Sequence, residues 1–430
     1  MLFRSVSFPG VLVALAISVT LIIKKLNPVS SMFLGTVIGS LVGGASLQHL
    51  MIYILIPGVQ SVMGVIIRII AGGVLAGVLI ESGAAESIAK CIVEKLGEKR
   101  ALLALALSAM ILLAVGIFVA VSLVILAPIA LYVAHKAKVS KFAAILALSG
   151  GAKAGNIISP NPNTISVAES FGLPLSDVMI GGFIPGIVAL ITTMILVNML
   201  KNKGFKVADS DLEVAAAGVE SELPPFYKAI VAPLSAIVLL MLRPVGNVFD
   251  IELLKIFNLD AFIVLPLGAI IGALVMGKGY ELPDYVNKGI SRMAPVILML
   301  LGAGAISGLI ANSVLPDLLI IAMDKLGIPV LFLAPISGAI MGAASSSIAT
   351  GVIIAGSSFS EILLSQSVPA LSAAVLMHAG AAILDVMPHG NYFLASMDCM
   401  KVSMVDRLKV LPFEAIVGAV MTIVAIIIYR

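Results

Sequence analysis

Long apolar runs, separated by short polar or charged stretches, dominate the sequence. A run of about 20 apolar residues is long enough to cross the hydrocarbon core of a bilayer as a helix. Plain runs of about this length lie near residues 9–24, 31–47, 61–81, 178–200, 227–242, 261–277, 290–312 and 411–429. The pattern therefore predicts an all-α, polytopic membrane protein.

Two further apolar runs are too long for one span and contain no charged loop that would divide them into two. They cover about 101–134 and 328–363. Small residues interrupt the middle of both runs, at Gly116 and Ser122 in the first and over 342–347 in the second. We predict that each run is a re-entrant hairpin, which enters and leaves the membrane on one side.

Two polar, proline-containing stretches lie between apolar runs, at 155–164 and 382–391. Pro160 and Pro388 occupy equivalent places in them, 228 residues apart. Backbone that lacks helical hydrogen bonds is tolerated at membrane depth only where it is buried in protein or lines a wet cavity. We therefore predict broken helices over about 141–170 and 367–397, with a binding site between the breaks near the middle of the membrane.

The order of these elements repeats along the chain, which predicts two related halves. The first half covers 1–204, the second covers 227–430, and a charged, proline-containing linker covers 205–226. We expect five transmembrane helices, one of them broken, and one re-entrant hairpin in each half. Because five is odd, the halves would have opposite orientations in the membrane and form an inverted repeat.

Composition narrows the range of functions. The chain is 60% hydrophobic and only 11% charged, whereas charged residues make up about 25% of a soluble domain. The lipid bilayer is therefore its expected surrounding, and no nucleic-acid partner is indicated. Cys91 and Cys399 show neither metal-ligand nor redox-motif spacing, so we predict free thiols, no metal site and no cofactor.

The distribution of basic residues predicts the orientation of the chain. The predicted helices place 19 of the 26 Lys and Arg residues on one side of the membrane and five on the other. Basic loops face the cytoplasm. We therefore predict a multi-pass protein of the cell membrane with both termini extracytoplasmic and the linker and the mouth of the first hairpin cytoplasmic.

Polar side chains at the breaks and hairpin tips are the predicted substrate-binding set. Half-helix ends at mid-membrane attract anionic groups, and their free carbonyls can hold a cation, which suits a small organic anion with a coupling ion. The set comprises Asn156, Ser159, Asn161, Asn163, Thr164, Ser122, Ser345, Ser346, Ser347, Thr350, His389 and Asn391. The alternative is that these side chains only cap the ends of the broken helices.

Lys153 and Asp385 are predicted to couple transport to an ion, because a charge at membrane depth is costly without a function. Asp385 would take up a proton or help to hold Na⁺, and Lys153 would meet a substrate carboxylate or neutralise Asp385. A static Lys153–Asp385 ion pair is the alternative. His389 lies in the break and is the better titrating candidate, whereas His378 on its apolar helix is expected to be a packed histidine.

Residues 71–97, with the run Gly72-Gly-Val-Leu-Ala-Gly-Val-Leu-Ile-Glu-Ser-Gly83, and the following residues to 101 resemble the gluconate permease family, a branch of the ion transporter superfamily. The similarity continues through the break at 156–164 and to 403–408. The resemblance implies a proton-coupled symporter for sugar acids or related hydroxy-acids. It also implies a homodimer in which a moving domain, holding both hairpins and both broken helices, makes an elevator-like movement.

The sequence differs from that family at the first break, where 159–164 replaces a histidine-containing run, and at the first hairpin, where 117–122 lacks an acidic residue. We therefore extend the family's fold to this chain, but not gluconate as the substrate. Asp385 is the candidate replacement for the family's coupling acid.

Three functions are open on the sequence alone. The leading prediction is a secondary active transporter that imports a small organic anion with H⁺. The neutral oxygen donors and the deep carboxylate of Asp385 would also suit a Na⁺/H⁺ or other cation/proton antiporter on the same scaffold. A passive channel is disfavoured, because paired broken helices predict alternating access. An enzyme is not expected, because the chain has no nucleophile elbow, zinc-protease motif or Walker loop.

Overall fold

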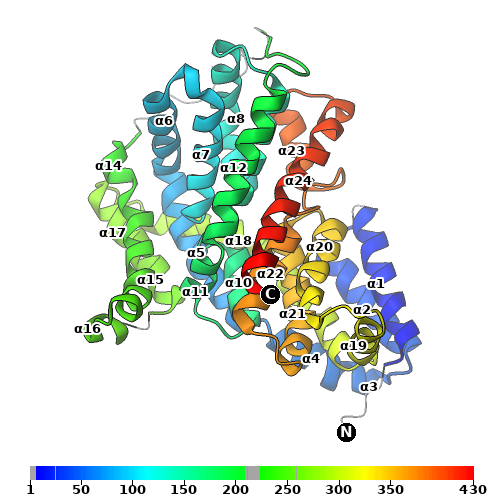
Figure 1. The fold of residues 1–430 in the computed structure, drawn as a ribbon. Coiled ribbons are helices and arrows are strands. Elements are labelled where there is room, and N and C mark those ends of the chain that lie inside the picture. Colours follow the sequence, from blue (N-terminus) through cyan, green and yellow to red (C-terminus); the bar gives the residue numbers. More distant parts are fainter. Residues whose placement is uncertain (1–5, 25, 209–210, 212–222, 258) are drawn as a thin grey trace.

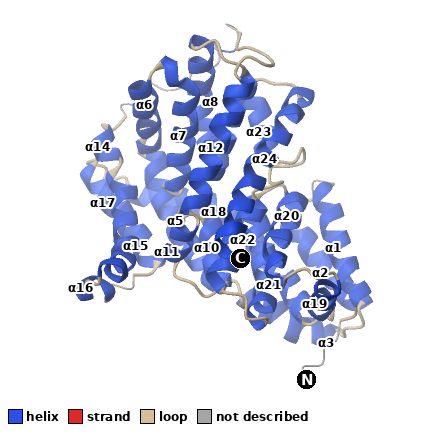
Figure 2. Cartoon of the chain, viewed as in Figure 1, coloured by secondary structure: helices blue, strands red, loops and turns tan. Residues whose placement is uncertain are grey.

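The structure is a computed structural model that describes residues 6–24, 26–208, 211, 223–257 and 259–430. These residues form helices joined by short turns, together with two isolated β-bridges and no strand (Figure 2). Most of the linker predicted at 205–226 lies outside the described residues. Seven of the described helices are long and apolar enough to cross a membrane, and five shorter apolar helices accompany them. The helical content and the number of apolar helices confirm the prediction of an all-α polytopic membrane protein.

The helices follow one another in two similar series (Figure 1). The first series is α1 (Phe8–Ile23), α2 (Pro28–Val42), α3 (Leu47–His49), η1 (Leu50–Leu55), α4 (Ile56–Gln60), α5 (Met63–Glu81), α6 (Ala84–Leu96), η2 (Glu98–Arg100), α7 (Ala101–Ala114), α8 (Val119–Lys136), α9 (Lys141–Asn156), α10 (Pro162–Ser170), α11 (Leu175–Gly181) and α12 (Phe183–Leu200). The second is α14 (Phe226–Ala229), α15 (Val231–Phe249), α16 (Glu252–Lys255), α17 (Ala261–Val275), α18 (Leu282–Ala311), α19 (Leu315–Lys325), η3 (Val330–Phe332), α20 (Leu333–Ser345), α21 (Ile348–Ser365), α22 (Ala370–Ala381), α23 (Asn391–Met400) and α24 (Met404–Tyr429).

The third predicted span was too short. The sequence suggested 61–81, but the helical stretch runs from Leu47 to Glu81 and includes the π-helical turn η1.

Six long helices form one layer of the molecule, in the order α15, α17, α5, α18, α2 and α1 (Figure 1). Each packs against the next, and α5 and α18 lie at the centre. Small residues allow this close approach: a Cβ added to Gly289 would lie 2.2 Å from the carbonyl oxygen of Gly73. Close packing through small residues is a main source of helix association in lipid.

Two helix pairs, α7 with α8 and α20 with α21, and the helices that follow each pair form a second layer in front of the first (Figure 1). In this layer α7 packs along α9, and α20 packs along α22 in the same way. A Cβ at Gly155 would lie 2.1 Å from the carbonyl oxygen of Met110, and one at Gly342 would lie 2.5 Å from that of Ala381. The layers meet where α10 packs on α5 and α21 packs on α18.

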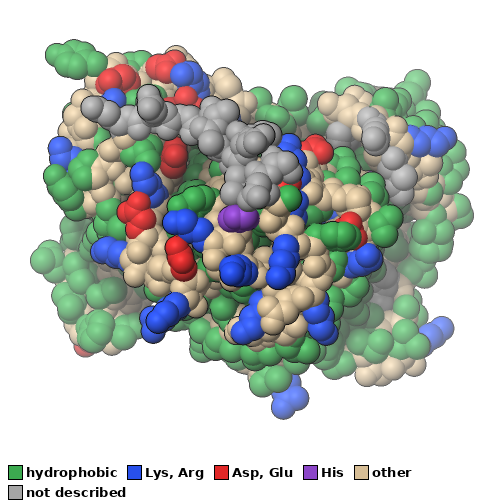
Figure 3. Space-filling model, turned by 90° about the horizontal axis from the view of Figure 1, so that it is seen from above, with side chains coloured by type: hydrophobic (Ala, Val, Ile, Leu, Met, Phe, Trp, Pro, Cys, Tyr) green, Lys and Arg blue, Asp and Glu red, His purple; other side chains and the backbone are tan. Residues whose placement is uncertain are grey.

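The molecule has two distinct ends. At one end Ser140 bridges to Lys206, and Lys141 Nζ donates to the carbonyl oxygen of Lys401 at 2.9 Å. Figure 3 looks onto this end and shows many Lys and Arg side chains across it. At the opposite end Val6 bridges to Ser313.

Candidate functional site

The first broken helix stops at Asn156 and resumes at Pro162, and Asn161 closes the gap between them. The Asn161 side-chain oxygen accepts hydrogen bonds from the backbone N–H groups of Asn163 (2.9 Å) and Thr164 (3.2 Å). This is an N-cap, and the proline that follows suits the first position of a helix. Asn161 therefore caps α10.

Asn156 is the centre of the hydrogen-bond network in this break. Its side-chain oxygen accepts from the amide groups of Asn161 (3.1 Å) and Asn163 (2.8 Å), and its backbone oxygen accepts from the hydroxyl of Thr164 (3.2 Å). All four side chains are at least nine-tenths buried. Because one amide oxygen serves two neighbours, the network fixes the shape of a backbone stretch that has no helical hydrogen bonds.

His378 of α22 extends this network to the second broken helix. Its Nε2 lies 3.2 Å from the side-chain oxygen of Asn156, and the ring is buried. His378 is packed, as the sequence suggested, but it also joins the two broken helices. Among the described residues, its Nδ1 and the buried hydroxyl of Ser159 have no hydrogen-bond partner. Two uncommitted polar atoms are thus available in the apolar interior near the first break.

Lys153 and Asp385 form an ion pair that joins the first broken helix to the second break. Lys153 lies in the last turn of α9, is 2% exposed, and also donates to the carbonyl oxygen of Ala382. The Asp385 side chain is 11% exposed. A buried pair persists only where both charges find partners, which is the case here.

The tip of the second hairpin lies against the second break. The Ser346 hydroxyl donates to the carbonyl oxygen of Met387 at 2.9 Å and accepts from the N–H group of the same residue at 2.7 Å. His389 Nε2 lies 3.2 Å from the carbonyl oxygen of Ala344. Ser346 itself has a left-handed backbone (φ 50°), which is unfavourable for serine. The contacts with the break offset this cost.

The other predicted residues make local contacts instead. Ser122 donates to Val119 within α8, and Ser345 donates to Met341 within α20. Ser347 caps α21 at the N–H group of Thr350. The Thr350 hydroxyl contacts the sulfur of Met299 on α18, and the first residue of α23, Asn391, is exposed. The structure therefore brings together the first break, Lys153 and Asp385, but does not bring Ser122 or Asn391 into the same network.

Sequence analysis missed a second buried ion pair, between Arg407 and Glu414 on α24. The guanidinium makes two 2.8 Å hydrogen bonds to the carboxylate, and both side chains are at most 1% exposed. Arg407 also donates to Ser396 and stacks on Phe393, both on α23. The spacing of seven residues between Arg407 and Glu414, two turns along one helix face, was the signal for the pair.

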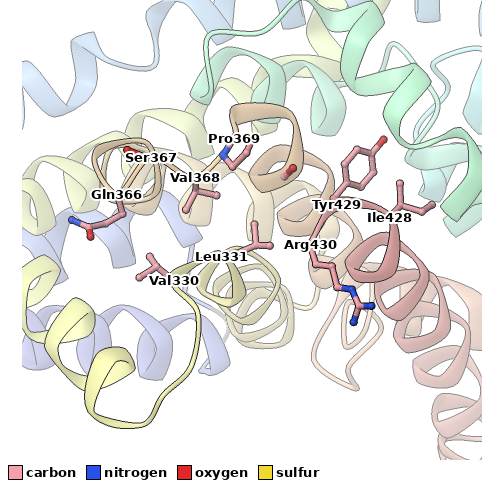
Figure 4. A pocket seen from close by; sticks show the side chains of 10 residues that line it. Val330, Leu331, Gln366, Ser367, Val368, Pro369, Ile428, Tyr429 and Arg430 are labelled. Atoms are coloured by element: carbon pink, nitrogen blue, oxygen red, sulfur yellow. The ribbon is translucent and has the colours of Figure 1, made fainter.

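Two cavities lie away from this network. One, of about 570 Å³, lies between α4, α5, α10, α18, α19 and α21. The other, of about 530 Å³, lies where the last residues of the chain, Ile428 to Arg430, meet the turn over 366–369 (Figure 4). The predicted site residues line neither cavity.

Comparisons with known proteins agree with this architecture. The chain is 47% identical to an uncharacterized transporter of Haemophilus influenzae, over 99% of this chain and 98% of the relative. It is 21% identical to the high-affinity gluconate transporter of Escherichia coli, over 66% of this chain and 65% of that protein. The solved structure of MtrF from Neisseria gonorrhoeae, described as one of a class of antimetabolite efflux pumps, is similar with a TM-score of 0.57. That match has 14% identity and covers 89% of this chain and 82% of MtrF, so it concerns the fold alone.

The family model described as GntP family permease matches residues 7–430, which is nearly the whole chain. The resemblance drawn from the sequence is thereby confirmed, and the members compared here are permeases and transporters rather than enzymes. The chain belongs to the GntP permease family.

Proposed function

We propose that the chain is a secondary active transporter that moves a small organic anion together with H⁺. The observation that carries this proposal is the Lys153–Asp385 ion pair, which is buried and joins the two broken helices. Ionisable groups at membrane depth are expensive and are usually tied to an ion or substrate pathway. The similarity to a gluconate transporter supports an organic anion as the substrate class.

Charge balance explains how this pair would couple the two solutes. With Asp385 ionised, the pair is neutral, and Lys153 has no free charge for a substrate. An entering carboxylate competes with Asp385 for Lys153, and the displaced aspartate then takes up a proton to avoid an unpaired buried charge. The loaded site is again neutral, with one anion and one proton bound. Neither solute alone gives a neutral site.

The arrangement of the helices supports alternating access as the mechanism. We infer that the two series of helices are inverted repeats and that the layer with the hairpins and broken helices moves against the other layer. The main contacts between the layers are α10 on α5 and α21 on α18, with smaller ones of α11 on α15 and α20 on α1. We further propose a homodimer in the cell membrane, with both termini extracytoplasmic. Val6 bridges to Ser313 at the end opposite the Lys- and Arg-rich face, which fits that orientation for the N-terminus.

Purified protein in liposomes that contain a pH-sensitive dye tests this function. Sugar acids, other hydroxy-acids and dicarboxylates would be added in turn, followed by Na⁺ alone. Acidification of the interior on adding one anion is the expected result and also identifies the substrate class. A pH change driven by Na⁺ alone would favour a cation/proton antiporter, and no pH change with any solute would contradict proton coupling.

A further inference from the structure

The cavity of about 570 Å³ between the two layers differs chemically from the network around Lys153. Eight serines line it: Ser61 at the end of α4, Ser166 and Ser170 of α10, Ser307 of α18, and Ser357, Ser358, Ser360 and Ser365 of α21. Three carboxylate residues, Glu169, Asp317 and Glu361, also line it. No Lys, Arg or His is among the described residues of the lining.

The hydrogen bonds of the serines determine what they offer to a ligand. Ser166 donates to the carbonyl oxygen of Pro162 (2.7 Å), Ser170 donates to that of Ser166 (2.8 Å), and Ser357 donates to that of Ile353 (2.7 Å). A hydroxyl has one proton to donate but two lone pairs to accept with. Because these protons are already used within the helices, the serines present acceptor oxygens to the cavity.

The charged residues in the lining also favour a cationic ligand. Glu169 is neutralised by Arg68 of α5 at 2.6 Å. Glu361 is exposed and makes neither an ion pair nor a side-chain hydrogen bond with the described residues. The cavity therefore has negative charge and acceptor oxygens. A carboxylate can only accept hydrogen bonds and would be repelled, whereas a cationic group would be attracted.

Ser358 adds an independent sign of a missing ligand. It lines the cavity, is 7% exposed, and its hydroxyl has no hydrogen-bond partner among the described residues. A buried polar atom without a partner is costly, so it needs an occupant such as an ion, a solute or a water molecule.

We propose that this cavity binds a small monovalent cation, either free Na⁺ or the ammonium group of an amine-bearing solute. Both seek several oxygen acceptors, and neither requires a donor from the protein. The site is separate from the Lys153–Asp385 pair and lies between α10 of one series and α21 of the other. Binding here does not depend on the proton-coupled step, so each proposal can fail without the other.

Equilibrium binding of ²²Na⁺ to the purified full-length protein, in buffer balanced with choline chloride, tests the proposal. Saturable binding is expected. Glu361→Gln should weaken it about tenfold by removing the unpaired charge, and Ser358→Ala should weaken it about fivefold by removing one acceptor. Ser337→Ala is the matched control, because Ser337 is a buried serine of α20 that donates to Ala334 and lies outside the cavity.

Competition with methylammonium distinguishes the two cation sources. Displacement of ²²Na⁺ at lower concentrations of methylammonium than of unlabelled Na⁺ would assign the site to an ammonium group. Displacement by unlabelled Na⁺ alone would assign it to the ion. Absence of saturable binding, or binding that is unchanged in both Glu361→Gln and Ser358→Ala, would overturn the proposal and leave a hydrated cavity.

Discussion

The two helix breaks differ in how they hold their backbone, although they occupy equivalent places in the chain. The first break is neutral and is held by amide groups around Asn156, all of them buried. The second contains the charged Asp385 and is held by other segments, Lys153 of α9 and Ser346 of the hairpin tip. The first is therefore organised mainly by its own amides, with one contact from His378 of α22, whereas the second depends on other segments. This difference makes the second break the one suited to change during a transport cycle.

The largest expected effect comes from leaving one charge of the second break unpaired. Lys153→Met should lower the free energy of unfolding by about 3–5 kcal/mol, because Asp385 would be buried without its cation. Adding Asp385→Asn in the same chain should restore most of this loss. Thermal unfolding in detergent, followed by a dye that reacts with the half-buried Cys91 and Cys399, measures both.

The matched control for that experiment is Lys288→Met. Lys288 pairs with Asp284 at 2.8 Å and with Glu81 at 3.2 Å, but its side chain is 51% exposed, and Glu81 keeps its ion pair with Arg292 in the variant. An exposed pair of this kind contributes at most about 1 kcal/mol. Equal losses in the Lys153 and Lys288 variants would mean that the buried pair has no special cost, and the contrast between the breaks would be wrong.

A smaller effect is expected in the first break. Asn156→Ala removes the acceptor for the amide groups of Asn161 and Asn163 and should cost about 1–3 kcal/mol, since buried donors would lose their partner. Asn198→Ala is the comparison, because its exposed amide bonds only to the backbone of its own helix. If both variants unfold at the same temperature, the amide network does not organise the break.

Removing the contact between the hairpin tip and the second break should lower the free energy of unfolding by less than Asn156→Ala does. Ser346→Ala loses both hydrogen bonds with Met387, for an expected loss of about 1–2 kcal/mol in unfolding free energy. Ser345→Ala, next in sequence, loses only local bonds, to Met341 of its own helix and to Ser347 two residues on, and should change stability by a few tenths of a kcal/mol. A larger loss of stability in Ser345→Ala than in Ser346→Ala would show that the hairpin tip does not support the second break.

The smallest effect concerns Asp211, which pairs with Lys141 at 2.9 Å where the first broken helix begins. Burial pushes the pKa of Asp211 upward, but the hydrogen bonds from Lys141 and from the backbone N–H of Ala208, together with the charges of Lys141 and Lys401, outweigh burial and hold the pKa below its usual value. A lowered folded pKa stabilises the protein above the unfolded value of 3.8, and this contribution disappears as the pH falls through the folded pKa.

Asp211→Asn should therefore lower stability by about 1 kcal/mol or less at neutral pH, because Lys141 keeps its bond to the carbonyl oxygen of Lys401. The difference from the unsubstituted chain should stay constant between pH 5 and pH 8 and shrink only below about pH 4. Unfolding curves at several pH values check this. A difference that changes between pH 6 and pH 7 would contradict the assignment.

The sequence predicts the helices better than the site, for a physical reason. The bilayer imposes a length and a hydrophobicity on every span, so apolar runs and their interruptions indicate the helices directly. In the structure the breaks lie between Asn156 and Pro162 and between Ala381 and Asn391. The sequence suggested a span that begins at 61, whereas the helical stretch begins at Leu47.

The site depends on contacts between residues that are far apart in the chain. Asn156 and His378 are 222 residues apart, and no local pattern connects them. Lys153 and Asp385 were named because isolated charges are rare in apolar segments, whereas the serines around Ser358 were missed because a serine in a membrane helix usually serves close packing. The assignment of the predicted residues to substrate and ion stays a prediction.

The most direct test of the account is transport by Asp385→Asn in liposomes. We expect exchange of labelled substrate for unlabelled substrate to be retained, because the anion can still reach Lys153, and accumulation driven by a pH gradient to be lost. Asp284→Asn, which alters an exposed ion pair, should keep both activities. Accumulation by Asp385→Asn at the level of the unsubstituted protein would contradict the central claim that this carboxylate couples transport to protons.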